Sequence, residues 1–210
     1  MKFMSRFCDQ KGHLVDYGGL YYSPHAFLSA VLRKAVGHRP KKPWISYRAI
    51  NHLSGLICPN WRVLEYGAGM STLWLARRCQ HVVSIEGNEF WFRTIDQMLK
   101  SQKISNVDLR LRKNDSYHII DDIPDHYVDF ALVDGWNRDE CMRTALCKVR
   151  RGGYIYLDNT DQYVNNPKGH TRIAENILLS HLKQIGATPT YFVDFCPANF
   201  FVSEGLLARV

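Results

Sequence analysis

The sequence lacks the features that mark membrane-spanning, secreted or disulfide-bonded proteins. No apolar run approaches the roughly 20 residues that a membrane-spanning helix requires. The N-terminal residues form no long apolar stretch before Asp9, so a secretory signal peptide is not expected. The six cysteines include no Cys-x-x-Cys pair, which argues against a zinc ribbon or a disulfide framework. We therefore expect a cytoplasmic protein with reduced thiols and no membrane partner.

Acidic residues are fewer than basic ones. The 210 residues include 27 Lys and Arg against 20 Asp and Glu, a formal net charge of +7. Such a balance can favour nucleic acid, but the basic residues form short clusters without a long tail or an RNA-binding signature. With 46% hydrophobic and 22% charged residues, the chain has the composition of one ordinary globular unit. We expect most of the charge to lie on solvated surface.

Two parts of the chain differ in their apolar pattern. Residues 24–37 and 46–57 have apolar residues at helical spacing, which predicts an N-terminal helical extension or lid over residues 1–60. From residue 61 onward, short apolar runs alternate with helical patterns, which predicts βαβ units and a buried parallel sheet in a domain over 61–210. The expected strands are 62–66, 81–86, 107–112, 128–134, 154–158, 190–195 and 200–210, and the expected helices of this domain are 71–78, 89–101, 138–149 and 172–185.

A glycine-rich turn follows the first expected strand, in the sequence Val-Leu-Glu-Tyr-Gly-Ala-Gly-Met-Ser-Thr over residues 63–72. Glycines at such a turn permit a tight bend and the close approach of a ligand to the backbone. The dinucleotide pattern G-x-G-x-x-G is incomplete because Thr72 stands at its third glycine. The phosphate-binding pattern G-x-x-x-x-G-K-[ST] is also absent. Both observations disfavour a nicotinamide dehydrogenase and a nucleotide triphosphatase.

Polar residues stand at the ends of the other expected strands. Glu86 ends the second strand about twenty residues beyond the glycine turn, where a carboxylate can accept hydrogen bonds from ribose hydroxyls. The corresponding residues of the next three strands are Asn114, Asp115 and Ser116; Asp134, Gly135 and Trp136; and Asp158 and Asn159. Each residue by itself is open to a structural interpretation as a turn, cap or packing residue. Their joint order and spacing favour a cofactor site.

This order of motifs, E-x-G-x-G-x-S, strand-end Glu, N-D, V-D-G and G-G-x-I-x-x-D-N, resembles the class I S-adenosylmethionine-dependent methyltransferases over residues 61–159. The resemblance implies a Rossmann-like α/β three-layer sandwich. Its seven-stranded, mostly parallel sheet would have the order 3-2-1-4-5-7-6, with strand 7 antiparallel.

The resemblance also implies where S-adenosylmethionine binds. The glycine turn would surround its methionine part, Glu86 would hold its ribose, and Asp115 with Ser116 would flank its adenine. The implied cofactor-binding residues are Glu65, Tyr66, Gly67, Ala68, Gly69, Ser71, Glu86, Gly87, Asn114, Asp115, Ser116, Asp134 and Trp136.

Asp134, Asp158 and Asn159 resemble the magnesium-binding set of catechol-type O-methyltransferases, so they are the candidate catalytic residues and candidate Mg²⁺ ligands. The match is incomplete, because Asn137 stands where that family has a lysine. Direct contact with the acceptor is therefore an alternative to metal binding. A structural alternative is that Asp158 and Asn159 start a loop and hydrogen-bond to local backbone donors. Aromatic residues at Trp44, Tyr47 and Tyr163 are candidate walls of an acceptor pocket.

We expect methyl transfer to an oxygen or nitrogen of a small molecule. One alternative is a methyltransferase acting on RNA or protein, which the +7 charge favours. The other is a protein that binds S-adenosylmethionine without catalysis. Against RNA, the sequence has no appended RNA-binding module and no N-P-P-[YF] tetrad.

Overall fold

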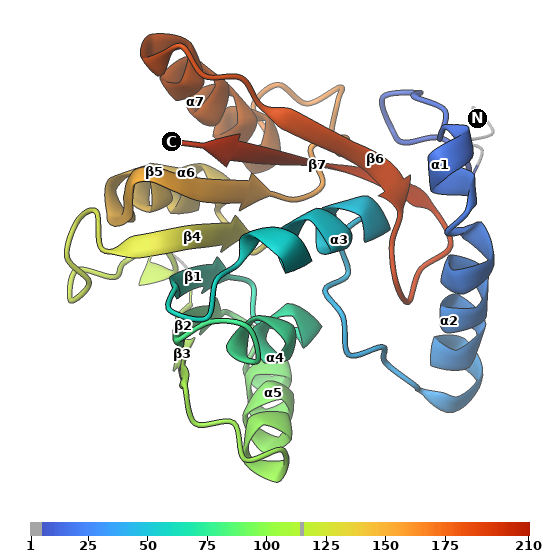
Figure 1. Cartoon of the computed structure of the whole chain (residues 1–210), viewed down its shortest axis with the longest axis horizontal. Helices are drawn as coiled ribbons and strands as arrows, with labels where there is room; N and C mark the ends of the chain where they lie inside the picture. Colours follow the sequence, from blue (N-terminus) through green and yellow to red (C-terminus); the bar gives the residue numbers. More distant parts are fainter. Residues whose placement is uncertain (1–5, 114–115) are drawn as a thin grey trace.

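The computed structural model describes residues 6–113 and 116–210, which form a seven-stranded sheet with helices on both faces (Figure 1). The strand order is β3-β2-β1-β4-β5-β7-β6. β1 to β5 pair in parallel, whereas β7 runs antiparallel to both β5 and β6. The strands are β1 (Arg62–Tyr66), β2 (His81–Glu86), β3 (Val107–Leu111), β4 (Val128–Val133), β5 (Val149–Leu157), β6 (Thr190–Phe195) and β7 (Val202–Arg209). The expected fold class, sheet order and antiparallel strand are confirmed.

The helices cover the two faces of the sheet unequally. α3, α4 and α5 pack on one face, while α6 and α7 pack together on the other. Successive side chains along a strand point to opposite faces of the sheet, so each strand contributes to the hydrophobic core on both faces. Val63 and Phe130 face the α3 side, and Leu64 and Ala131 face the α6 side. The helices are α1 (Tyr17–Leu20), α2 (Ser23–Val36), α3 (Tyr47–Leu56), α4 (Met70–Ala76), α5 (Glu89–Ser101), α6 (Arg138–Lys148) and α7 (His170–Ile185).

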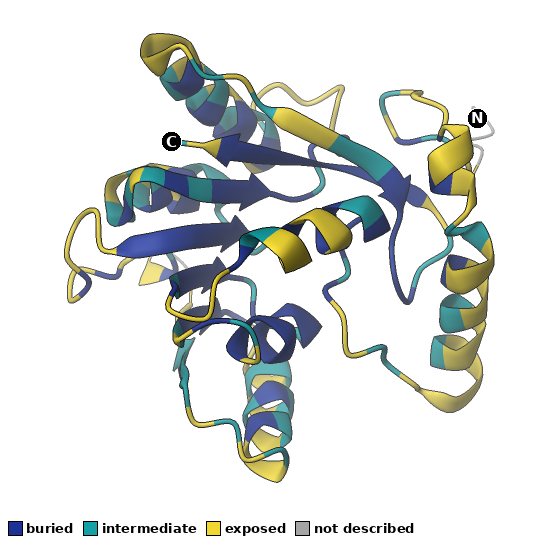
Figure 2. Cartoon of the chain, in the orientation of Figure 1, coloured by how far each residue is buried: buried dark blue, intermediate teal, exposed yellow. Residues whose placement is uncertain are grey.

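The N-terminal helix α2 lies at the edge of the molecule, beside the turn between β6 and β7 (Figure 1). Phe27 of α2 contacts Phe200 of that turn edge to face, with ring centroids 5.4 Å apart. Figure 2 shows that the inner strands β1, β4 and β7 are largely buried, that the edge strand β6 is partly exposed, and that much of α2 is exposed. No described helix is both long and apolar enough to cross a membrane.

The fifth strand is longer than the sequence pattern predicts. It begins at Val149 rather than at residue 154, and Val149 pairs with Val128 of β4. The pairing register shifts between Val128 and Phe130, and Gly152 has φ 75°. Gly152 and Gly153, which precede the expected strand, form an irregular, bulge-like stretch within the observed one.

Candidate active site

The turn between β1 and α4 brings its backbone against the loop that follows β4. Gly67 has φ 100°, a conformation that glycine adopts readily and other residues rarely do. A Cβ atom at this position would lie 2.9 Å from the backbone nitrogen of Gly135 and 3.0 Å from the carbonyl carbon of Asp134. The backbone nitrogens of Gly67 and Ala68 both donate to the carbonyl of Ile85 in β2. The glycine therefore lets the ends of β1, β2 and β4 come together.

Glu65 lies beneath this turn and is fully buried. Its Oε2 accepts hydrogen bonds from Thr72 Oγ1 and Ser84 Oγ, each at 2.5 Å. Thr72 Oγ1 in turn accepts a hydrogen bond of 2.9 Å from the backbone nitrogen of Gly69. Burial raises the pKa of Glu65 to about 7, although the hydroxyl hydrogen bonds lower it. Glu65 thus supports the glycine turn from below, and it does not line the cavity that the turn borders.

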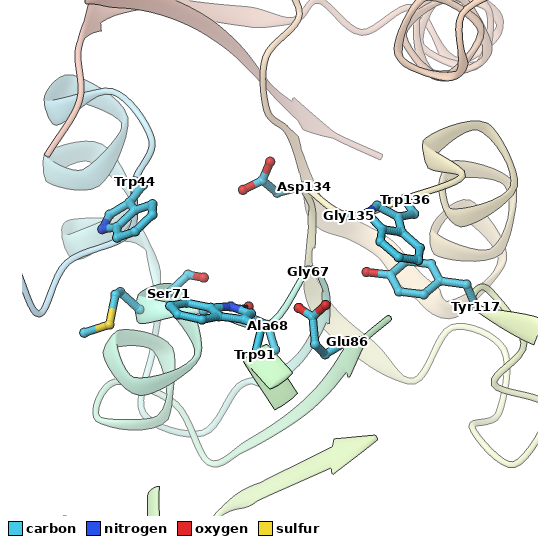
Figure 3. A pocket seen from close by; sticks show the side chains of 12 residues that line it. Trp44, Gly67, Ala68, Ser71, Glu86, Trp91, Tyr117, Asp134, Gly135 and Trp136 are labelled. Carbon is cyan, nitrogen blue, oxygen red and sulfur yellow. Dashed lines mark hydrogen bonds between the residues drawn. The ribbon is translucent and has the colours of Figure 1, made fainter. Parts of the chain in front are cut away.

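A cavity of about 220 Å³ opens beside the turn, at the carboxyl ends of β1 and β4 (Figure 3). The chain order of the sheet reverses at β1, which has β2 on one side and β4 on the other. Parallel α/β sheets bind their ligands at such a switch point. The cavity is lined by Trp44, Gly67, Ala68, Gly69, Met70, Ser71, Glu86, Trp91, Tyr117, Asp134, Gly135 and Trp136.

Glu86 directs its carboxylate toward this cavity from the end of β2 (Figure 3). Its Oε1 accepts hydrogen bonds from the backbone nitrogens of Gly87 at 2.8 Å and Asn88 at 2.7 Å. No donor among the described residues bonds to Oε2. Burial raises the pKa of Glu86, against the effect of the two backbone hydrogen bonds. One oxygen is therefore fixed by the loop, and the other can accept a hydrogen bond from a ligand.

Aromatic side chains form the walls of the cavity. Trp91, from the first turn of α5, donates from Nε1 to the carbonyl of Ala68 at 2.6 Å. Trp44 lies 6.4 Å from Trp91 between ring centroids, so the N-terminal segment contributes a wall to this cavity. On the other side, Trp136 packs against Tyr117 with centroids 6.2 Å apart. Trp91 and Tyr117 were missed by the sequence reasoning, although each lies within a few residues of a strand-end motif.

Asp134 follows β4 and lines the cavity, with its side chain 34% exposed. Its Oδ1 accepts a hydrogen bond of 2.8 Å from Nη2 of Arg138, the first residue of α6. The same Nη2 lies 3.1 Å from Oδ1 of Asn159. Partial enclosure raises the pKa of Asp134, whereas the charge of Arg138 lowers it. Arg138 was not among the expected site residues, because the resemblance concerns the third position after Asp134 and Arg138 is the fourth.

Asp158 is 2% exposed and does not line the cavity that Asp134 lines. Burial, and next the neighbouring charge of Asp134, raises the pKa of Asp158 well above its usual range. The structure therefore brings Asp134, Asp158 and Asn159 to one place, as expected, but around a guanidinium group. These residues do not fit a resident Mg²⁺ ion while Arg138 is bonded to the side chains of Asp134 and Asn159.

Other residues of the expected set lie elsewhere or outside the description. Tyr66 is fully buried, and its hydroxyl donates to the carbonyl of His118 at 3.0 Å. Gly87 packs so closely beneath Trp136 that a Cβ there would meet its ring at 2.9 Å. Ser116 is exposed and donates to the carbonyl of Lys113 within its own turn. Asn114 and Asp115 lie outside the described residues.

The candidate walls Tyr47 and Tyr163 have different surroundings. Tyr47 is buried in a cluster that includes Phe195 and Val202, so its expected role as a wall is wrong. Tyr163 lines a second cavity, of about 500 Å³, which shares Asp134 to Trp136 with the first. Polar side chains from the loop after β5 and from α7 border this second cavity, among them Gln162 and His170.

No protein-family model and no curated protein matches the chain. Among solved structures, it is similar to an O-methyltransferase from Bacillus cereus in complex with SAH, with a TM-score of 0.67 and 19% identity over 92% of this chain and 96% of that one. An O-methyltransferase of tomaymycin synthesis from Streptomyces achromogenes, in complex with SAM, gives a TM-score of 0.64 and 19% identity over 100% and 99%. An rRNA methylase from Streptococcus thermophilus gives 0.54 and 14% over 78% and 94%. The resemblance to the class I methyltransferases is thus confirmed for the fold.

Proposed function

We propose that this chain is an S-adenosylmethionine-dependent methyltransferase that acts on an oxygen or nitrogen of a small molecule. The observation that carries the proposal is the cavity at the switch point of the sheet, bordered by the backbone of Gly67 to Gly69 and by the available oxygen of Glu86. The solved structures with SAH and SAM that share this fold support the choice of cofactor.

The residues around the cavity fit that cofactor. The glycine turn would accept its methionine part, because no side chain projects from Gly67 or Gly69. Glu86 would accept hydrogen bonds from ribose hydroxyls through Oε2. Trp136, which packs over Gly87, would cover the adenine ring system of the cofactor. When bound, S-adenosylmethionine supplies an activated methyl group whose bond to sulfur breaks as the acceptor's lone pair forms the new bond.

Asp134 is the proposed base of the reaction. It lines both cavities, so it separates the cofactor side from the side that would hold the acceptor. A hydroxyl or amine loses a proton when it is methylated, and the Asp134 carboxylate can take that proton if the acceptor lies within hydrogen-bond distance. Arg138 donates hydrogen bonds to the side chains of Asp134 and Asn159 and so fixes the orientation of both.

The proposal is tested with methyl-labelled S-adenosylmethionine and a panel of catechols, phenols, amines and sugars, next to total RNA and a protein extract. Label in a small molecule is the expected result. Label in RNA or protein would show that the acceptor is not a small molecule, while the reaction would still be methyl transfer. Binding of the cofactor without transfer to any of these classes would favour the non-catalytic alternative and contradict the proposal.

A further inference from the structure

The side chain of Arg138 turns back from the start of α6 toward the loops that follow β4 and β5. Its side chain is 11% exposed. A positive charge in the first turn of a helix is unfavourable, because the helix dipole is also positive there. Arg138 therefore needs acceptors around it, and the two strand-end loops supply them.

The guanidinium group uses all three of its nitrogens on these loops. Nε donates to the carbonyl of Gly135 at 3.1 Å, and Nη1 to the carbonyl of Asp158 at 2.5 Å. Nη2 donates to the carbonyl of Asp134 at 3.1 Å, to its Oδ1 at 2.8 Å and to Oδ1 of Asn159 at 3.1 Å. Five oxygen atoms from two loops thus surround one cation.

These are the kinds of ligand that a divalent cation would use. Carboxylate, amide and carbonyl oxygens are the ligands of Mg²⁺ and Ca²⁺ in proteins. Here a guanidinium holds them, and it joins the end of β4 to the end of β5 as a bridging ion would. The guanidinium carries a positive charge, as a metal ion does. A second cation at the same oxygens would lie beside it and be repelled.

We propose that Arg138 is a built-in replacement for a divalent cation at the carboxyl ends of β4 and β5, so that this site binds no metal ion. A consequence for catalysis, which rests on the proposed function, is that methyl transfer by this chain needs no metal ion. Arg138 is a positioning residue: it borders the second cavity, but its guanidinium nitrogens are bonded to the two loops, where they orient Asp134 and Asn159.

A second group of side chains must be controlled in any metal-binding measurement. Asp9, His13 and Glu204 place three potential ligand atoms within 4.8 Å of one another, in a different part of the described chain. Lys11 already pairs with Glu204 there, with Nζ 2.5 Å from Oε1. The His13→Ala background removes one of these three ligands without touching the cavity.

The test is a titration of the full chain with Mn²⁺, in which electron paramagnetic resonance measures the free ion. All proteins carry His13→Ala, and each is titrated with and without S-adenosylhomocysteine. Neither the parent nor its Asp134→Asn variant should bind Mn²⁺ at this site, so their titrations should be the same. Arg138→Met should bind one Mn²⁺ at least tenfold more tightly than the parent, and Arg138→Met with Asp134→Asn should lose that gain.

One Mn²⁺ on the parent that Asp134→Asn removes would overturn the proposal. This comparison does not depend on how well Arg138→Met folds. A folded Arg138→Met protein that gains no Mn²⁺ would also overturn it, since the oxygens would then not form a cation site. Calorimetry of the same proteins measures S-adenosylhomocysteine binding, so failure of the cofactor assignment is seen separately from failure of the metal inference.

Discussion

Gly67 and Asp134 approach each other through their backbones, so that a Cβ on Gly67 would lie 3.0 Å from the carbonyl carbon of Asp134. This contact joins the turn proposed to hold the cofactor to the residue proposed as the base. The geometry of the cavity therefore depends on the absence of one side chain.

Gly67→Ala should destabilise the protein and weaken binding of S-adenosylhomocysteine. The substitution forces alanine into a positive φ and against the backbone of the loop after β4, which together cost about 1–3 kcal/mol. Denaturant unfolding and calorimetry measure the two effects. Gly55→Ala is the matched control, because a Cβ at this position in α3 meets nothing within 4 Å; it should leave stability unchanged or raise it. A Gly67→Ala protein as stable as the parent would contradict the argument.

Glu86→Gln should reduce the affinity for S-adenosylhomocysteine by about 1.5–3 kcal/mol, the range for a lost charge-assisted hydrogen bond. The amide keeps the shape of the side chain and one acceptor for the backbone of Gly87. Glu89→Gln is the control, since its side chain is 47% exposed and lies outside the cavity. Equal dissociation constants for the parent and Glu86→Gln would show that the carboxylate does not hold the ligand.

Glu65 should make the stability of the free protein fall as pH rises from about 5 to about 8. Its pKa is raised from 4.5 to about 7 in the folded chain, so in this window the folded state binds more protons than the unfolded state. Stability is then lost as pH rises, by on the order of 2–3 kcal/mol from this group. Glu65→Gln should flatten that part of the pH profile, measured by urea unfolding at each pH. A slope of the same size in Glu65→Gln would assign the effect to other groups.

Asp134→Asn should lower turnover by about 10²-fold, the usual scale for loss of a general base, while the affinity for S-adenosylhomocysteine changes little. The amide can still accept the hydrogen bond from Arg138, so the loop should keep its position. Steady-state kinetics with an acceptor found by screening gives the turnover. Full activity of Asp134→Asn would exclude this residue as the base and leave the cofactor assignment unaffected.

The sheet and the glycine turn could be predicted because their signals are local. Apolar runs of strand length, separated by helical patterns, gave the bounds of β1, β2 and α5 as the structure has them. Gly67 could be recognised because a turn with positive φ favours glycine. Glu86 could be recognised because it ends a strand next to that turn.

The surroundings of side chains could not be predicted in the same way. An arginine four positions after Asp134 has the spacing of any surface pair on a helix, and its role appears only when β5 brings Asn159 beside it, 21 residues further along the chain. Tyr47 lies on the apolar face of its helix, but the sequence does not show that Phe195 lies opposite. Glu65 was expected to surround the ligand, whereas strand alternation places it under the turn with Thr72.

The most direct test of the account is isothermal titration calorimetry of the protein with S-adenosylhomocysteine, with NAD titrated under the same conditions. We predict one site that binds S-adenosylhomocysteine at micromolar concentration, that is weakened by Gly67→Ala and by Glu86→Gln, and that does not bind NAD. No heat at millimolar S-adenosylhomocysteine, or tighter binding of NAD at this cavity, would contradict the account.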